Sequence, residues 1–221
     1  VTTEYVRDHL VRNLIDLPTS RFIVLPCGIN VSEFHPDNTR GIREKYALPD
    51  RYVICPGALT AAKGPQNVVA SSVHYADLAP TIFIGDGELR EELEAKLGDR
   101  GRFLGFVSAE DKAKLINAAT LLVAAPEKKE HFGIIYAEAL CGGTPTVAYE
   151  GGGVSSIVTP ETGVLTERNT AGLGQTVQAL LGNTEQYAMM AKACRARGNT
   201  LFSHLMLGAR LEEWLSGICT A

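Results

Sequence analysis

Short apolar runs alternate with helix-like segments from residue 52 onward, and this alternation constrains the fold more than any other feature. The runs occupy 52–57, 81–85, 102–106, 120–126, 144–149 and 162–166, and helical patterns follow the first four at 64–76, 88–98, 108–119 and 133–143. Strands that are apolar along their whole length are typical of a parallel sheet covered on both faces. The sequence therefore predicts an α/β fold, a Rossmann-like parallel sheet with helices on both faces.

The flanking segments follow other patterns. Residues 3–14, whose apolar positions include Leu14, predict a helix, and "RFIVLPCGI" (21–29) predicts a strand ending in a turn. A connector with a short helix covers 34–50. After residue 166 only helices are expected, at about 169–181, 183–197 and 204–216.

The composition indicates a folded protein without a nucleic-acid partner. Hydrophobic residues make up 45% of the 221 residues and the net charge is −4, whereas nucleic-acid domains usually carry a basic face. The pair Lys128–Lys129 is interpreted as part of a solvated helix face. Five dispersed cysteines are expected in a reducing compartment, and the cytoplasm is the predicted location. No apolar stretch is long enough for a membrane span, and no signal peptide is recognised. The first residue is valine, so we expect a piece of a longer protein.

Loops after parallel strands share one edge of the sheet, where α/β proteins bind ligands. The loops concerned are 57–64, 85–88, 106–108, 126–133 and 149–153. None of the five histidines shows metal-ligand spacing, so no metal site is predicted. The Gly-x-Gly of "GDGELR" (85–90) is interpreted as a turn. The glycines of "YEGGGVSS" (149–156) fit a phosphate-binding nest or a flexible turn equally well.

The segment "EHFGIIYAE" (130–138) places a carboxylate at each end of a loop-to-helix junction. If a helix begins near Phe132, its first amides, around Gly133 and Ile134, lack internal acceptors and suit an anionic ligand. Glu130 and Glu138 could then accept hydrogen bonds from ligand hydroxyls. The alternative makes Glu130 a charge near the helix cap and Glu138 a surface helix residue.

The loop "GALTAAKG" (57–64) offers a cation to the same edge. Gly57 ends a strand and Lys63 precedes a helix, so the lysine could neutralise phosphate. Pro65 after Lys63–Gly64 rules out a Walker loop. The alternative, a solvated lysine near a helix start, is disfavoured because a cation opposes the helix dipole there.

Together these segments resemble the carboxyl-terminal half of family 4 glycosyltransferases, the retaining group with the two-domain GT-B fold. The resemblance is carried, in the family's order, by "LPCGIN" with "FHP", "GALTAAKG", "GDGELR", "RFLGFVSAEDKAKLINAA", "EHFGIIYAEALCGGTPTVAYEGGGVSSIV" and "ETGVL". It covers the chain from residue 24 to about residue 165.

This resemblance implies a Rossmann-like domain that binds a UDP- or GDP-sugar donor and transfers the sugar with retention, without an obligatory metal or other cofactor. Glu130 would contact the donor sugar, Glu138 the ribose, and Lys63 the diphosphate. The loop residues Gly57, His131, Phe132, Gly133 and Ile134 would line the donor site, with Phe106 and Val107 near the base. Glu130 and Lys63 would be the catalytic pair.

The resemblance also implies a division of the chain. Residues 1–36 would be the remnant of the acceptor-domain edge with the interdomain linker, 37–200 the donor-binding domain, and 201–221 a C-terminal helix that packs back on a missing amino-terminal domain. The acceptor, a glycan, a lipid-linked sugar or a small molecule, is not predicted, although polysaccharide biosynthesis fits the family. Peripheral membrane attachment would come through the missing domain, and the isolated chain is expected to be inactive.

Four positions depart from the family pattern. Ala58 stands where the family has an arginine, and Ser156 stands where it has a glutamate. In the linker, Cys27 replaces a usual asparagine and Asn30 a usual aspartate. An arginine fork on a diphosphate contributes about 2 kcal/mol when desolvated. The loss of this arginine supports an alternative hypothesis, a non-catalytic domain of glycosyltransferase ancestry that binds a nucleotide sugar or a partner chain.

Overall fold

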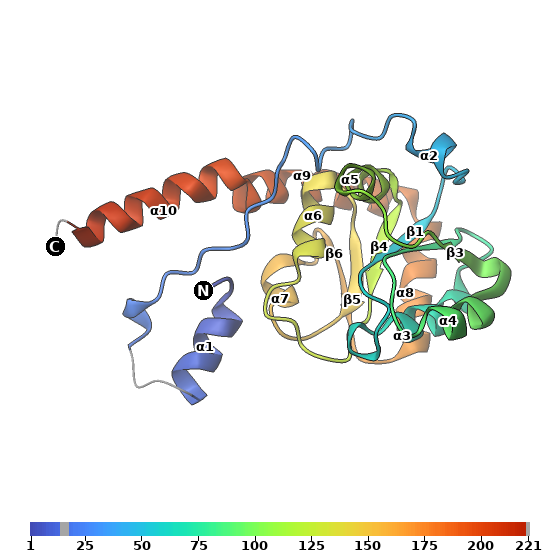
Figure 1. Ribbon diagram of the computed structural model, residues 1–221, viewed down its shortest axis with the longest axis horizontal. Helices are drawn as coiled ribbons and strands as arrows, with labels where there is room; N and C mark the ends of the chain where they lie inside the picture. Colours follow the sequence, from blue (N-terminus) through green and yellow to red (C-terminus); the bar gives the residue numbers. More distant parts are fainter. Residues whose placement is uncertain (14–17, 220–221) are drawn as a thin grey trace.

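The computed structural model describes residues 1–13 and 18–219, and within them it has one six-stranded parallel sheet surrounded by helices (Figure 1). The strands are β1 (Val53–Pro56), β2 (Thr81–Ile84), β3 (Gly101–Phe103), β4 (Leu121–Ala124), β5 (Thr146–Tyr149) and β6 (Gly163–Thr166). Each lies within or overlaps a predicted run, and all five pairings are parallel. The predicted fold class is therefore confirmed.

The helices follow the predicted alternation. They are α1 (Glu4–Asn13), α2 (Ile42–Lys45), α3 (Pro65–Ser71), α4 (Arg90–Leu97), α5 (Ala109–Ala118), α6 (Ile134–Gly142), α7 (Val154–Ile157), α8 (Thr170–Gly182), α9 (Thr184–Phe202) and α10 (His204–Cys219). Short 3-10 turns occupy Thr19–Arg21, Ala61–Lys63, Ser72–His74 and Gly98–Arg100. Leu14, which was predicted to belong to the first helix, lies outside the described residues.

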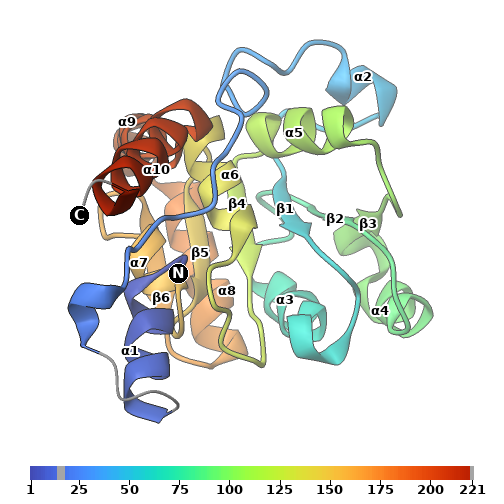
Figure 2. The same ribbon diagram turned by 60° about the vertical axis from the view of Figure 1, so that its left-hand side comes forward.

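The two faces of the sheet bury separate apolar cores. Ile54 and Leu122 point toward α5 and α6, whereas their neighbours Val53 and Val123 point toward α3, α4 and α8. Figure 2 shows the two helix layers on opposite sides of the strands. Side chains alternate across a strand, so apolar residues at every position require a cover on both faces. This is why the strands read as continuous apolar runs.

The strand order is β3-β2-β1-β4-β5-β6. The chain runs outward from β1 to β3, returns to place β4 on the other side of β1, and then runs outward again. The order therefore reverses between β1 and β4, and the loops that leave their carboxyl ends diverge there. In open α/β sheets such a switch point is where ligands bind.

The prediction of a strand at 21–29 is wrong. The chain from Phe22 to Gly28 pairs with no strand, and only Ile29 forms an isolated bridge, with Ser203. The segment runs past the α9–α10 junction, where the Ile29 amide donates to Phe202 O and the His204 amide donates to Ile29 O. The edge strands of the sheet are β3 and β6, and the apolar run pairs with neither of them. It packs instead as an extended linker. Beyond this junction α10 extends away from the sheet (Figure 1).

Candidate functional site

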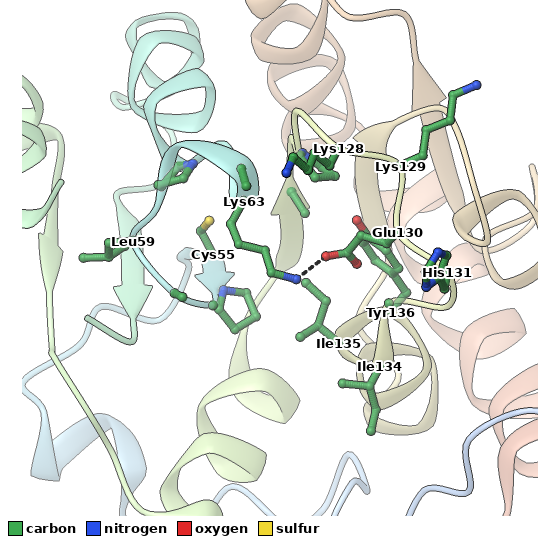
Figure 3. Close-up of a pocket in the computed structure, with 18 residues that line it drawn as sticks. Cys55, Leu59, Lys63, Lys128, Lys129, Glu130, His131, Ile134, Ile135 and Tyr136 are labelled. Atoms are coloured by element: carbon green, nitrogen blue, oxygen red, sulfur yellow. Dashed lines mark hydrogen bonds and ion pairs between the residues drawn. The ribbon is translucent and has the colours of Figure 1, made fainter. Parts of the chain in front are cut away.

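A cavity of about 430 Å³ opens at the switch point between β1 and β4 (Figure 3). Its wall comes from the end of β1 and the following loop, from the loop after β4, and from the first turn of α6. The lining residues are Cys55, Pro56, Gly57, Ala58, Leu59, Ala62, Lys63, Pro65, Ala124, Pro126, Lys128, Lys129, Glu130, His131, Gly133, Ile134, Ile135 and Tyr136. Three predicted segments, 57–64, 126–133 and the start of α6, therefore meet around one hollow.

Direct backbone contact holds the first two loops together. The amide of Glu127 donates to Ala62 O at 3.1 Å. Gly64 has φ +68°, and a Cβ there would overlap the carbonyl of Ala125. Only glycine combines this left-handed conformation with so close an approach. The loop that carries Lys63 is thus fixed against the loop that carries Glu130.

Lys63 and Glu130, which are 67 residues apart in the chain, form an ion pair inside the cavity. The Lys63 Nζ lies 2.5 Å from Glu130 Oε1, as the dashed line in Figure 3 marks. The Glu130 side chain is 16% exposed, whereas the Lys63 side chain is 52% exposed. The lysine can therefore turn to an incoming anion more easily than the carboxylate can move.

The first turn of α6 faces the same hollow without a cap of its own. Gly133 is the N-cap residue, with φ +85°, and it has no side chain to accept from the first amides. Those amides have no acceptors within the helix, and they carry the positive end of its dipole. The junction therefore offers backbone N–H groups to an anionic or hydroxyl-rich ligand.

The loop before α6 is anchored on several sides. Thr3 Oγ1 donates to His131 O at 2.8 Å, and the Gly153 amide donates to Glu130 O at 2.8 Å. The Phe132 ring is buried against Phe202, with 6.0 Å between ring centroids. The glycines 151–153 thus pack against this loop. These glycines help to hold the loop that carries Glu130 in place. Neither of the two interpretations of this segment, a phosphate-binding nest or a flexible turn, included this role.

Glu138 lies on α6 but outside the cavity lining. Its residue is 6% exposed, and Lys112 Nζ of α5 lies 2.6 Å from its Oε1. Burial raises the pKa of Glu138, and the nearby Lys112 opposes this increase. The alternative of a surface helix residue is therefore wrong for Glu138. Its Oε2 is buried with no hydrogen-bond partner among the described residues.

Some of the predicted site residues line the cavity and others do not. Gly57, Lys63, Glu130, His131, Gly133 and Ile134 line the cavity, whereas Phe106, Val107, Phe132 and Glu138 do not. Phe106 is 84% exposed on the loop before α5, and Val107 packs against the core. The cavity thus includes six of the ten predicted site residues.

Sequence reasoning missed several lining residues. Lys128 and Lys129 belong to the loop after β4, not to a helix face, and both line the cavity. Ile135 and the buried Tyr136 line it from α6. The two lysines directly precede Glu130 in a loop that was expected at the ligand-binding edge of the sheet, and this position could have indicated that they line the site.

The described residues, 1–13 and 18–219, contain neither a candidate metal cluster nor a helix able to cross a membrane. No group of three or more histidine, cysteine, aspartate or glutamate side chains could hold a metal ion there. No helix in the same ranges has both the length and the apolarity needed to cross a bilayer.

The parallel sheet, the helices on both of its faces and the cavity at its switch point define a Rossmann-like domain. The model of the family "Glycosyl transferases group 1" matches residues 39–197. The chain belongs to this glycosyltransferase family, as the sequence resemblance implied.

Two curated relatives illustrate the similarity. The chain is 24% identical, over 226 residues, to the GDP-mannose-dependent alpha-(1-6)-phosphatidylinositol dimannoside mannosyltransferase of Mycobacterium tuberculosis, with 100% of this chain and 58% of the relative covered. It is 30% identical over 214 residues to the D-inositol 3-phosphate glycosyltransferase of Xylanimonas cellulosilytica, with 88% and 51% covered. The chain thus spans little more than half the length of these relatives.

Solved structures share the fold. Sucrose-phosphate synthase from Thermosynechococcus elongatus superposes with a TM-score of 0.87 at 25% identity, covering 100% of this chain and 58% of that one. HepE from Anabaena, in complex with UDP and glucose, gives 0.84 at 20% identity, with 98% and 62% covered. The C-terminal domain of the group 1 glycosyl transferase LpcC from Francisella tularensis gives 0.71 at 21% identity, with 80% and 100% covered.

Proposed function

We propose that this chain is the donor-binding half of a retaining glycosyltransferase and that its cavity holds the diphosphate and sugar of a nucleotide-sugar donor. The observation that carries the proposal is the meeting of Lys63, Glu130 and the uncapped α6 terminus around one hollow. Cationic side chains and amides fit a diphosphate, and a carboxylate fits sugar hydroxyls.

The charge of the lining supports an anionic ligand. Among the described residues that line the cavity, Lys63, Lys128 and Lys129 are cationic and Glu130 is the one carboxylate. During transfer, negative charge builds on the leaving diphosphate, and positioned cations and amides stabilise it. Lysines and amides can supply this stabilisation, so the proposed reaction does not depend on a metal. The donors named for relatives and neighbours, GDP-mannose and UDP with glucose, are the first candidates.

The remaining predicted contacts belong to the same proposal. Glu138 would accept from a ribose hydroxyl, and the backbone near Phe106 and Val107 would meet the base. Phe132 would contribute its backbone amide, because its ring is buried. Glu130 and Lys63 would act on the donor during the reaction.

We also propose the division of the chain into an acceptor-domain edge with linker (1–36), a donor-binding domain (37–200) and a C-terminal helix (201–221). The apolar side chains Leu205, Met206, Trp214, Leu215 and Ile218 of α10 are exposed. Such a surface is a candidate contact for the remaining part of a two-domain enzyme. The isolated chain would then bind donor without transferring sugar. We place the complete enzyme in the cytoplasm, with any membrane attachment through its other domain.

The alternative function, a non-catalytic nucleotide-sugar-binding or partner-binding domain, is favoured by one observation. Ala58 lines the cavity at the position of the family arginine and carries no charge. Lys63, Lys128 and Lys129 line the same cavity, so it retains cationic residues without this arginine. We therefore favour the enzymatic function.

Calorimetric titration of UDP, GDP, UDP-glucose and GDP-mannose into the chain tests donor binding. We expect at least one to bind saturably and Glu138→Ala to weaken that binding. Absence of binding by all four would refute the proposal. Unchanged affinity in the variant would remove Glu138 from the site. Supplying the amino-terminal half in trans and assaying sugar transfer separates the enzyme from the non-catalytic alternative.

A further inference from the structure

The helix face that lines the cavity continues to Glu138. Ile134 is in the lining, and Glu138 follows it by four residues on α6. Residues four apart lie on the same face of a helix, separated by about 6 Å along its axis. A ligand that extends from the cavity along this face therefore reaches Glu138 next.

Lys112 approaches the same carboxylate from a different helix. It belongs to α5, which begins at Ala109, directly after the loop that contains Phe106 and Val107. Its Nζ lies 2.6 Å from Glu138 Oε1, and its side chain is 31% exposed. Lys112 thus lies in the first turn of the helix that follows the loop expected to meet a base, and it contacts the carboxylate expected to meet a ribose.

The ion pair with Lys112 involves only one oxygen of the Glu138 carboxylate, Oε1. Oε2 of Glu138 is buried and has no hydrogen-bond partner among the residues that the structure describes. A buried acceptor without a partner is costly, and native structures rarely retain one without a reason. A ribose hydroxyl would supply the missing donor.

The two oxygens then have separate roles. Removing Lys112 would leave the carboxylate buried without a counter-charge, and it would also free Oε1 to rotate away from its present direction. A carboxylate that is neutralised or turned accepts less well from a hydroxyl than a fixed anion does.

We propose that Lys112 is a positioning residue for nucleotide recognition, which holds Oε1 of Glu138 and thereby presents Oε2 to a ribose hydroxyl of the donor. This inference rests on the proposed donor-binding function and adds a residue to it. Lys112 acts through Glu138, so its effect depends on the ribose hydroxyls of the ligand.

The experiment compares two classes of ligand on the full chain. UDP and GDP are titrated beside their 2′,3′-dideoxy counterparts into the unmodified chain, Lys112→Met and Lys112→Arg. Lys114→Met is the matched control, because Lys114 lies on the same helix and pairs with the exposed Glu110 at 2.6 Å. Far-UV circular dichroism establishes that each variant is folded.

We expect Lys112→Met to weaken binding of the ribonucleotide about 10-fold or more, the size of one lost charge-assisted hydrogen bond. Binding of the dideoxy form should change little, so the preference for ribose should shrink. Lys112→Arg should restore most of this preference, and Lys114→Met should behave like the unmodified chain.

Three results would overturn the inference: equal weakening of both ligand classes by Lys112→Met, unchanged ribonucleotide affinity, or tighter binding. The first would indicate a general structural role for Lys112, and the last would indicate competition with the ligand. Failure of the unmodified chain to bind any nucleotide would instead refute the proposed function, so the two failures are distinguishable.

Discussion

Gly133 controls the geometry of the proposed site, and Gly133→Ala tests this directly. The residue has φ +85°, and an added Cβ would lie 2.5 Å from Tyr136 Cδ2 and 2.7 Å from Glu130 Oε2. Tyr136 is 1% exposed, so neighbouring atoms enclose most of its ring. The substitution must therefore shift the ring, the Glu130 carboxylate or the start of α6.

Two costs combine in this variant. A residue other than glycine in the left-handed region loses about 1–2 kcal/mol. Overpacking a filled site costs about 1–3 kcal/mol more. We expect the free energy of unfolding to fall by about 2–5 kcal/mol, which lowers the melting temperature by roughly 2–4 °C for each kcal/mol in a chain of this size.

Gly41→Ala is the matched control. Gly41 has φ +74° at the start of α2, but a Cβ there meets no atom within 4 Å, and the residue lies outside the cavity lining. The free energy of unfolding of this variant should fall only by the cost of the left-handed conformation, about 1–2 kcal/mol. Nucleotide affinity should remain unchanged in it, whereas Gly133→Ala should weaken binding about 10-fold because Glu130 is displaced.

The assay is urea unfolding followed by far-UV circular dichroism, with calorimetric titration of the nucleotide that binds best. The difference between the two variants isolates the steric contribution at the α6 junction. The reasoning is refuted if Gly133→Ala is no less stable than Gly41→Ala and binds nucleotide as the unmodified chain does.

Three further predictions concern Lys63, Cys55 and Asp111. Lys63→Met should weaken nucleoside diphosphate binding by about 10-fold, because a charge-assisted contact is lost. It should change the free energy of unfolding by less than about 1 kcal/mol, because the Lys63 side chain in the ion pair with Glu130 is half exposed. Calorimetric titration and urea unfolding measure the two effects, and unchanged binding would contradict the assignment of Lys63 to the diphosphate. Burial raises the pKa of Cys55 to about 12, so at pH 8 its thiol should resist alkylation until the chain unfolds, despite lining the cavity; rapid labelling of the native protein, located by mass spectrometry, would disprove this. Lys45 donates to Asp111 and holds the pKa of that carboxyl below its usual value, so the resulting stability is present above the unfolded-state pKa and is lost as the pH falls through the folded-state pKa. Asp111→Asn should therefore cost about 1–2 kcal/mol at pH 7 and progressively less below about pH 4, as urea unfolding at several pH values would measure; a cost independent of pH would argue against this ion pair.

Much of the fold could be predicted because its signals are local. Apolar runs predicted all six strands, and helical periodicity predicted α3 to α6 to within a few residues. The error at 21–29 has a physical cause: an apolar run can pack as an extended linker against helices as well as in a sheet, and only the available neighbours decide.

The site was less predictable than the fold. The E-x7-E spacing singled out Glu130 and Glu138, but it could not indicate that one lies in the cavity and the other is buried against Lys112. The prediction that Lys128 belongs to a solvated helix face is wrong, because the role of this lysine depends on which loop lies opposite it. Burial and pairing across helices depend on contacts that no local pattern contains.

Local sequence patterns were enough to predict the alternation of strands and helices, the helix start near Gly133 and the resemblance to the glycosyltransferase family. These features follow from side-chain periodicity and backbone freedom, which act over a few residues. The position of β4 beside β1, in contrast, is known only from the folded sheet. That placement brings Lys63 to Glu130 across 67 residues and opens the cavity between them. Strand order arises from long-range pairing and packing free energies, so it exists only once the whole sheet has assembled.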